Sequence, residues 1–223
     1  MFHEIFILLQ KEFKNELTKK TSLLSILLYI ASISYLLFFL MKTQGALVKL
    51  EVKFWNMFYW VIVLFSIINS IYINFSKDNK ARMLYYFNMF RPESFILSKL
   101  IYHSIFSTII ALFTYLFFGI WLGNPIENNA IFLLTVLIAT NAFSAIYTLM
   151  TAISFQTNQS TLLSSILGFP ITIPIIIFTT KLCREAFSET ISGHFYTTLF
   201  SLLGFNFILI FLSIILFPFL WKE

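Results

Sequence analysis

The sequence has 223 residues, of which 59% are hydrophobic and only 11% carry a charge. Soluble domains carry about 25% charged residues, so this chain has too little polar surface to cover a globule in water, and lipid is the solvent that accepts the surplus. The net charge of +5 does not indicate nucleic-acid binding, because the 15 basic residues fall in short clusters between apolar runs. The single cysteine excludes an internal disulfide and a cysteine-based metal cluster.

Residues 1–20 are typical of an amphipathic helix at a membrane surface. The apolar positions that recur at three- and four-residue steps are Phe2, Ile5, Phe6, Leu9, Phe13 and Leu17. The charged residues expected on the opposite face are Lys11, Glu12, Lys14 and Glu16. Such a helix is either a simple anchor or a packing element that steadies the first span or contacts a partner.

Membrane spans can be located from the gaps between charges, because a charge at the bilayer centre costs about 2.5–3.5 kcal/mol on insertion scales. Uncharged runs of 21, 23, 27 and 32 residues occupy 21–41, 54–76, 100–126 and 190–221. Each holds one helix of the ~20 residues that cross a bilayer. A longer run of 53 residues, 128–180, is broken by the polar stretch QTNQS at 156–160 and therefore predicts two spans.

The predicted fold is all-α: a single membrane domain, residues 1–223, in which six transmembrane helices follow the interfacial helix. The expected spans are approximately 22–41, 54–75, 98–122, 130–154, 161–180 and 197–220. With six spans both termini share a side, and that side would hold ten basic residues against five on the other. The positive-inside rule therefore predicts that both termini are cytoplasmic.

The segment between the second and third spans, residues 76–94, is the longest charged stretch. It reads SKDNKARMLYYFNMFRPES, and Pro92 is expected to end one short helix and begin the next. Arg82, Tyr85 and Tyr86 combine charge with aromatic area, as protein-binding surfaces do. The alternative is an interfacial segment whose tyrosines lie at headgroup depth.

Few residues suggest chemistry, and the sequence has no phosphate-binding loop for ATP, no zinc-protease motif and no nucleophile elbow. We therefore expect no catalytic, metal or cofactor site in this chain. His103 is the one ionisable residue well inside a predicted span. Its role could be a structural hydrogen bond, gating, or contact with a cargo such as haem. Pro170 and Pro174 interrupt the fifth span and indicate either a kink at a helix–helix contact or a hinge.

Several stretches together resemble one family of membrane proteins. They are FWNMFYWVIVLFSIINSI from Phe54, ARMLYYFNMFRPESFILSKLIYHS, the turn LGNP at Leu122–Pro125, and STLLSSILGFPITIPIII. In order, spacing and length they resemble CcmB, the haem exporter protein B family, which is similar to ABC-2-type permeases. The resemblance extends from the N-terminal amphipathic helix to the closing LFPFLWKE.

The resemblance implies a permease subunit of the cytochrome c maturation system in the inner (cytoplasmic) membrane. Its expected partners are a separate ABC ATPase subunit (CcmA-like) that binds ATP, membrane subunits similar to CcmC and CcmD, and a haem chaperone similar to CcmE. Haem is the candidate cargo of the complex. Residues 76–94 fall where the family meets its ATPase, which favours a coupling role for that segment. The residues expected to carry it are Arg82, Leu84, Tyr85, Tyr86, Phe87 and Arg91.

Two other functions remain open from the sequence. One is an ABC-2-type permease that exports a lipid, a drug or a polymer. The other is a membrane scaffold that organises partners without transport.

Overall fold

The computed structural model describes residues 1–18, 21–43, 51–78, 86, 89–156, 161–188 and 193–220. Every regular element among these residues is helical. The α-helices are α1 (Phe2–Thr18), α2 (Thr21–Thr43), α3 (Val52–Ser76), α5 (Pro92–Leu122), α6 (Asn129–Gln156), α7 (Thr161–Arg184) and α8 (Phe195–Leu220). A short 3₁₀ helix, η1 (Glu185–Phe187), extends α7.

Six of the described helices are long and apolar enough to cross a membrane. They contain Leu23–Thr43, Val52–Ser76, Pro92–Leu122, Asn129–Ser154, Ser164–Phe187 and Phe195–Phe219. This agrees with the all-α, six-span fold expected from the gaps between charges.

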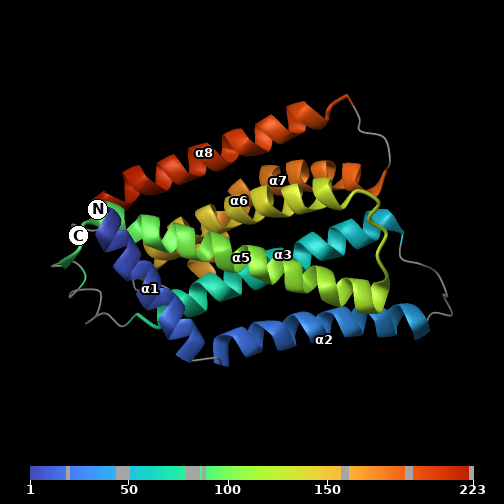
Figure 1. Ribbon diagram of the computed structural model, residues 1–223, viewed down its shortest axis with the longest axis horizontal. Coiled ribbons are helices and arrows are strands. Elements are labelled where there is room, and N and C mark those ends of the chain that lie inside the picture. Colours follow the sequence, from blue (N-terminus) through green and yellow to red (C-terminus); the bar gives the residue numbers. More distant parts are fainter. Residues whose placement is uncertain are drawn as a thin grey trace.

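The six long helices form a bundle with α3 and α6 near its centre (Figure 1). In the most apolar part of each helix, 61% of the α3 residues and 67% of the α6 residues are buried, against 17% for α2 and 22% for α8. α2 and α8 therefore lie on the outside of the bundle. They expose large apolar side chains such as Leu28, Phe207 and Phe211, for which lipid is the favourable surrounding.

An aromatic cluster closes the end of the bundle where α3 begins and α5 ends. The Trp55 ring stacks on Tyr59 and meets Phe118 and Phe187 edge to face. Trp55 Nε1 donates a hydrogen bond to the carbonyl of Gly123, 3.1 Å away. Gly123 has a φ of 82°, a left-handed conformation that glycine adopts without strain, and so it can end α5 there.

α5 is the longest helix, with 31 residues. At 1.5 Å per residue it is roughly 46 Å long, more than the ~30 Å hydrocarbon core. It begins at Pro92, where a missing N–H is harmless, whereas the sequence placed the start of this span near residue 98. Its first two turns therefore extend beyond the apolar part of the span and carry Ser94 and Lys99 with them.

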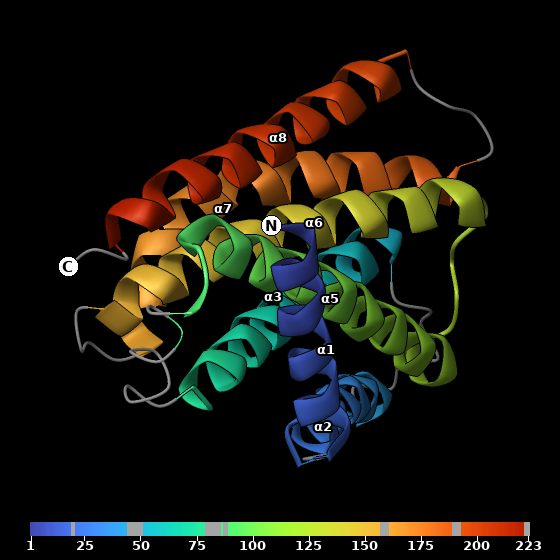
Figure 2. The ribbon, with the colours of Figure 1, turned by 60° about the vertical axis from the view of Figure 1, so that its left-hand side comes forward.

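α1 crosses the bundle at the end where α8 finishes and packs against α5 (Figures 1 and 2). Its buried face combines Ile5 and Leu8 with Glu12 and Glu16. The sequence pattern is wrong here, because it placed both carboxylates opposite the apolar face. Periodicity within α1 cannot reveal that the neighbouring helices supply lysines to pair with them.

Candidate functional site: a buried ionic network

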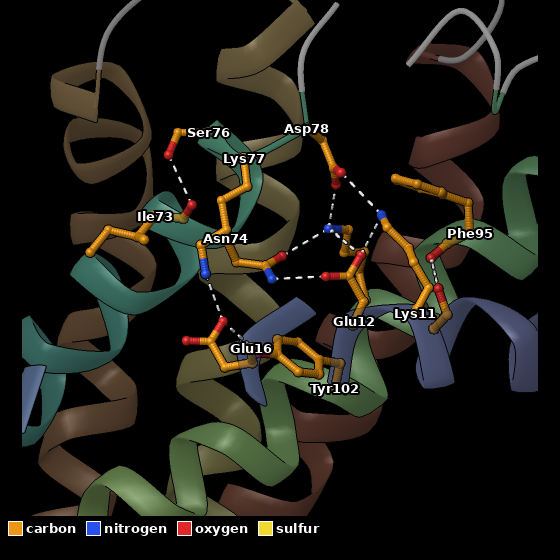
Figure 3. A network of polar contacts seen from close by, with 12 residues as sticks. Lys11, Glu12, Glu16, Ile73, Asn74, Ser76, Lys77, Asp78, Phe95 and Tyr102 are labelled. Atoms are coloured by element: carbon orange, nitrogen blue, oxygen red, sulfur yellow. Dashed lines mark hydrogen bonds and ion pairs between the residues drawn. The ribbon is translucent and has the colours of Figure 1, made fainter. Parts of the chain in front are cut away.

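An ionic network joins α1, the end of α3 and the start of α5 (Figure 3). Its members are Lys11, Glu12, Glu16, Asn74, Lys77, Asp78, Lys99 and Tyr102, and we refer to this set as the ionic network. Three lysines and three carboxylates make it electroneutral. α1 and α5 each supply at least two of these side chains, whereas α3 supplies Asn74 and is followed directly by Lys77 and Asp78.

Lys99 lies at the centre of the network and is only 1% exposed. Its ammonium group is 2.9 Å from Glu12 Oε1, and it donates hydrogen bonds to Asp78 Oδ2 and Asn74 Oδ1, each at 2.8 Å. An ammonium group has three N–H donors, so three acceptors satisfy it completely. Three segments distant in the sequence thus converge on one nitrogen.

Lys11 is a second lysine that contacts both carboxylates around Lys99. Its Nζ is 2.9 Å from Glu12 Oε1 and 3.0 Å from Asp78 Oδ1. The remaining Glu12 oxygen, Oε2, accepts a hydrogen bond from Asn74 Nδ2 at 2.9 Å. The Glu12 and Asp78 carboxylates therefore each contact both ammonium groups. The Asn74 amide completes the cluster by donating to Glu12 and accepting from Lys99.

A second arm of the network begins one helical turn farther along α1. Glu16 Oε2 accepts a hydrogen bond from Lys77 Nζ at 2.7 Å and a longer one from the Tyr102 hydroxyl at 3.4 Å. The Phe13 ring meets the Tyr102 ring edge to face. This arm joins the same three elements a second time, so α1 is fixed in rotation as well as in position.

The electrostatics of the α1 members favour their charged forms. Burial alone would raise the pKa of the Glu12 carboxyl, but Lys99 and Lys11 lower it well below its usual value of 4.5. Burial alone would lower the pKa of Lys11, but Glu12 and Asp78 raise it above its usual value of 10.5. Both groups are therefore ionised at neutral pH.

The network lies beside the segment that the sequence assigned to coupling. The Lys11 ammonium group is 4.5 Å from the centroid of the Tyr86 ring, a cation–π contact. Tyr86 also packs against Phe90 and Phe95, and its carbonyl accepts a hydrogen bond from the Phe90 backbone. Arg91 is exposed and immediately precedes α5. Arg82, Leu84, Tyr85 and Phe87 lie outside the described residues.

Comparison with protein-family models gives a match to the CcmB protein family over residues 3–220. The chain belongs to the CcmB family. Six membrane-spanning helices and this match together make it a multi-pass membrane protein. No curated protein sequence matches the chain significantly.

In this CcmB-family chain His103 lies one helical turn beyond Lys99 and is buried. Its ring stacks on Phe75 at 5.8 Å and meets Tyr102 edge to face at 5.2 Å. Neither ring nitrogen has a hydrogen-bond partner among the described residues. The structure therefore places His103 against the Phe75 and Tyr102 rings beside the network, without the hydrogen bond expected of a purely structural histidine.

The two prolines of this CcmB-family chain lie inside a continuous α7. Pro170 is exposed and Pro174 is half-buried, so the Pro170 ring faces away from the bundle. The close contact between α6 and α7 lies nearby: the Tyr147 hydroxyl hydrogen-bonds to Thr172 at 2.9 Å, and Gly168 leaves room for the Tyr147 ring. His103 thus lies on α5 and both prolines lie on α7, and the ionic network includes none of them.

Sequence reasoning did not identify the carboxylates of the network as part of the site. The feature that could have indicated them is Lys99, a lysine that lies seven residues beyond Pro92 on a largely apolar helix. A lysine there requires an anionic partner if it is buried. The sequence does not identify which acid supplies that partner, because α1 and α5 are far apart in the chain.

Proposed function

We propose that this chain is the transmembrane permease subunit of an ABC-type complex in cytochrome c biogenesis. A separate CcmA-like ATPase subunit binds and hydrolyses ATP, and CcmC-like and CcmD-like membrane subunits complete the complex. ATP hydrolysis drives haem export or the release of a CcmE-like haem-loaded chaperone. The chain itself performs no catalysis and carries no cofactor.

The observation that carries this proposal is the CcmB-family match over nearly the whole chain. The ionic network supports the coupling role of residues 76–94. Asp78 near the start of that segment and Tyr86 near its middle both contact Lys11, so α1 lies against two parts of it. A segment held in this way between two spans can pass an ATPase movement to α3 and α5 together.

The complex lies in the inner membrane with both termini of this chain in the cytoplasm. α1 and the C-terminal end of α8 lie at the same end of the bundle, next to the ionic network (Figure 1). The ATPase would bind at that end, through Tyr86, Arg91 and the neighbouring coupling residues. α1 exposes Phe2 and Phe6 by 84% and 65%, which fits contact with lipid at the membrane surface.

Deleting the gene tests the proposal. We expect the deletion strain to lose holocytochrome c and to accumulate the haem-loaded chaperone, and a plasmid copy to restore both. Normal cytochrome without trapped chaperone would reject the maturation role and leave export of another substrate. Substitutions of Tyr86 and Arg91 separate a coupled permease from a scaffold: loss of ATP-dependent turnover while the ATPase still co-purifies with the tagged chain would reject the scaffold.

A further inference from the structure

The described part of the coupling segment contacts α1 through one charged and one aromatic side chain. Glu12 and Lys99 are each at most 5% exposed and form an ion pair between α1 and α5, at 2.9 Å. Asp78, near the start of the segment, contacts Lys99 and Lys11. Tyr86 covers Lys11 on the other side. The exit of α3, the helix α1 and the entrance of α5 therefore share one set of charges.

We propose that Glu12 and Lys99 are positioning residues that make α1, the end of α3 and the start of α5 move as a single unit. The part that this unit plays in coupling rests on the proposed function. The reason is electrostatic: in a buried electroneutral cluster, separating any one element leaves an unpaired charge without water. A push on the coupling segment is then shared by α3 and α5, and by α2 through its short connection to α1.

The expected effect of substituting Glu12 follows from the number of groups that its carboxylate contacts. Glu12 accepts from two lysines and one amide, so replacing it with glutamine removes one negative charge while keeping the size of the side chain. Lys11 and Lys99 are then left with Asp78 as the carboxylate that both contact. The two ammonium groups repel each other, and α1 loses its ionic contacts with α5.

Ser94 offers a nearly isosteric position at which to detect this separation. It lies in the first turn of α5, close to Glu4 of α1, and is 0% exposed. A cysteine there is protected from a maleimide while α1 is docked and reacts when α1 moves away. The native Cys183, also buried, is near the opposite end of the bundle and serves as an internal reference for general loosening.

The experiment uses the full chain in membranes of its own host, with Ser94→Cys labelled by a maleimide and both cysteines followed by mass spectrometry. We expect Glu12→Gln to raise the labelling rate at position 94 at least about fivefold and to leave Cys183 protected. Glu127→Gln, a matched change at an exposed carboxylate at the opposite end, should change neither. Unchanged labelling at position 94, or an equal increase at both cysteines, would overturn the proposal.

Two further measurements keep the proposal falsifiable. If Glu12→Gln fails to accumulate, Glu12→Asp replaces it: this change keeps the charge but shortens the side chain away from Lys99, so labelling at position 94 should rise in the same direction. In strains with an active wild-type complex, Glu12→Gln should lower holocytochrome c yield at least about tenfold at equal chain and ATPase abundance. Full holocytochrome c yield despite labelling of position 94 would reject the coupling role of Glu12 and leave the proposed permease function intact. An inactive wild-type complex would instead count against the permease function itself.

Discussion

Lys99 shows how this chain tolerates a charge close to the membrane core. A buried ammonium group without partners would be strongly unfavourable, but here two carboxylates and one amide oxygen surround it. Such a pair contributes little net stability relative to an apolar pair of equal volume, whereas the loss of one member is costly. The cluster therefore favours one particular arrangement of helices over others.

Replacing Lys99 with methionine should lower the free energy of unfolding by about 3–5 kcal/mol, because Glu12 and Asp78 would face Lys11 alone. The double substitution Glu12→Gln with Lys99→Met restores charge balance and should be less destabilised than Lys99→Met alone. Denaturation in mixed micelles measures both. Lys14→Met, on the exposed side of α1, is the control and should remain within about 0.5 kcal/mol of wild type.

The contribution of Glu12 to stability should depend on pH in a defined direction. Its pKa in the folded chain lies below its usual value of 4.5, so its contribution is fully present above pH 4.5 and is lost as the pH falls toward the lower folded value. Lys11 has a raised pKa, so its contribution is present below its usual 10.5 and is lost above it. The stability difference between wild type and Glu12→Gln should therefore be constant from pH 5 to pH 9 in the same micelle assay. A difference that halves within this range would contradict the ionic network.

At the scale of elements, the helices were predictable and their contacts were not. Charge-free runs located the spans because the cost of a charge in lipid acts on each helix separately. The inward rotation of Glu12 and Glu16 depends on Lys77 and Lys99, which lie more than 60 residues away in sequence. Side-chain amides also join helices: Asn74 accepts a hydrogen bond from Lys99, and Asn141 accepts one from Ser104.

The contact between α6 and α7 gives a prediction at this scale. A Cβ at Gly168 would lie 2.7 Å from Tyr147 Cε1, and the Tyr147 hydroxyl is held by Thr172. Gly168→Ala should therefore destabilise the chain by about 1–3 kcal/mol, because a buried ring must move. Gly204→Ala in α8 is the matched control, since nothing lies within 4 Å of its Cβ. Thermal unfolding in detergent should separate the two variants, and equal melting temperatures would contradict the close packing of α6 and α7.

At the scale of the whole molecule, the bundle has two chemically different ends. The end near Trp55 and Gly123 is closed by aromatic packing and a few hydrogen bonds to backbone carbonyls. The end near Lys99 holds the ionic network, the end of α8 and the whole of α1 (Figure 1). Under the proposed function, a partner that acts on the network end would move α1, the end of α3 and the start of α5 together.

The proposed coupling requires the network end to face the cytoplasm. The network end is expected to carry ten of the fifteen basic residues, and three of these, Lys11, Lys77 and Lys99, are paired with acids in the folded chain. The pairing does not weaken the orientation signal, because the positive-inside rule counts lysine and arginine near span ends and is not a net-charge rule. Reporter fusions at residue 1 and residue 223 should therefore be cytoplasmic, and an insertion at Asn124 should lie outside. Reversing the bias by adding lysines near Asn124 is the informative control, since it should lower the cytoplasmic fraction of the terminal fusions. Terminal fusions on the outer face of the unaltered chain would remove the ionic network from the reach of a cytoplasmic ATPase and, with it, the proposed route of coupling.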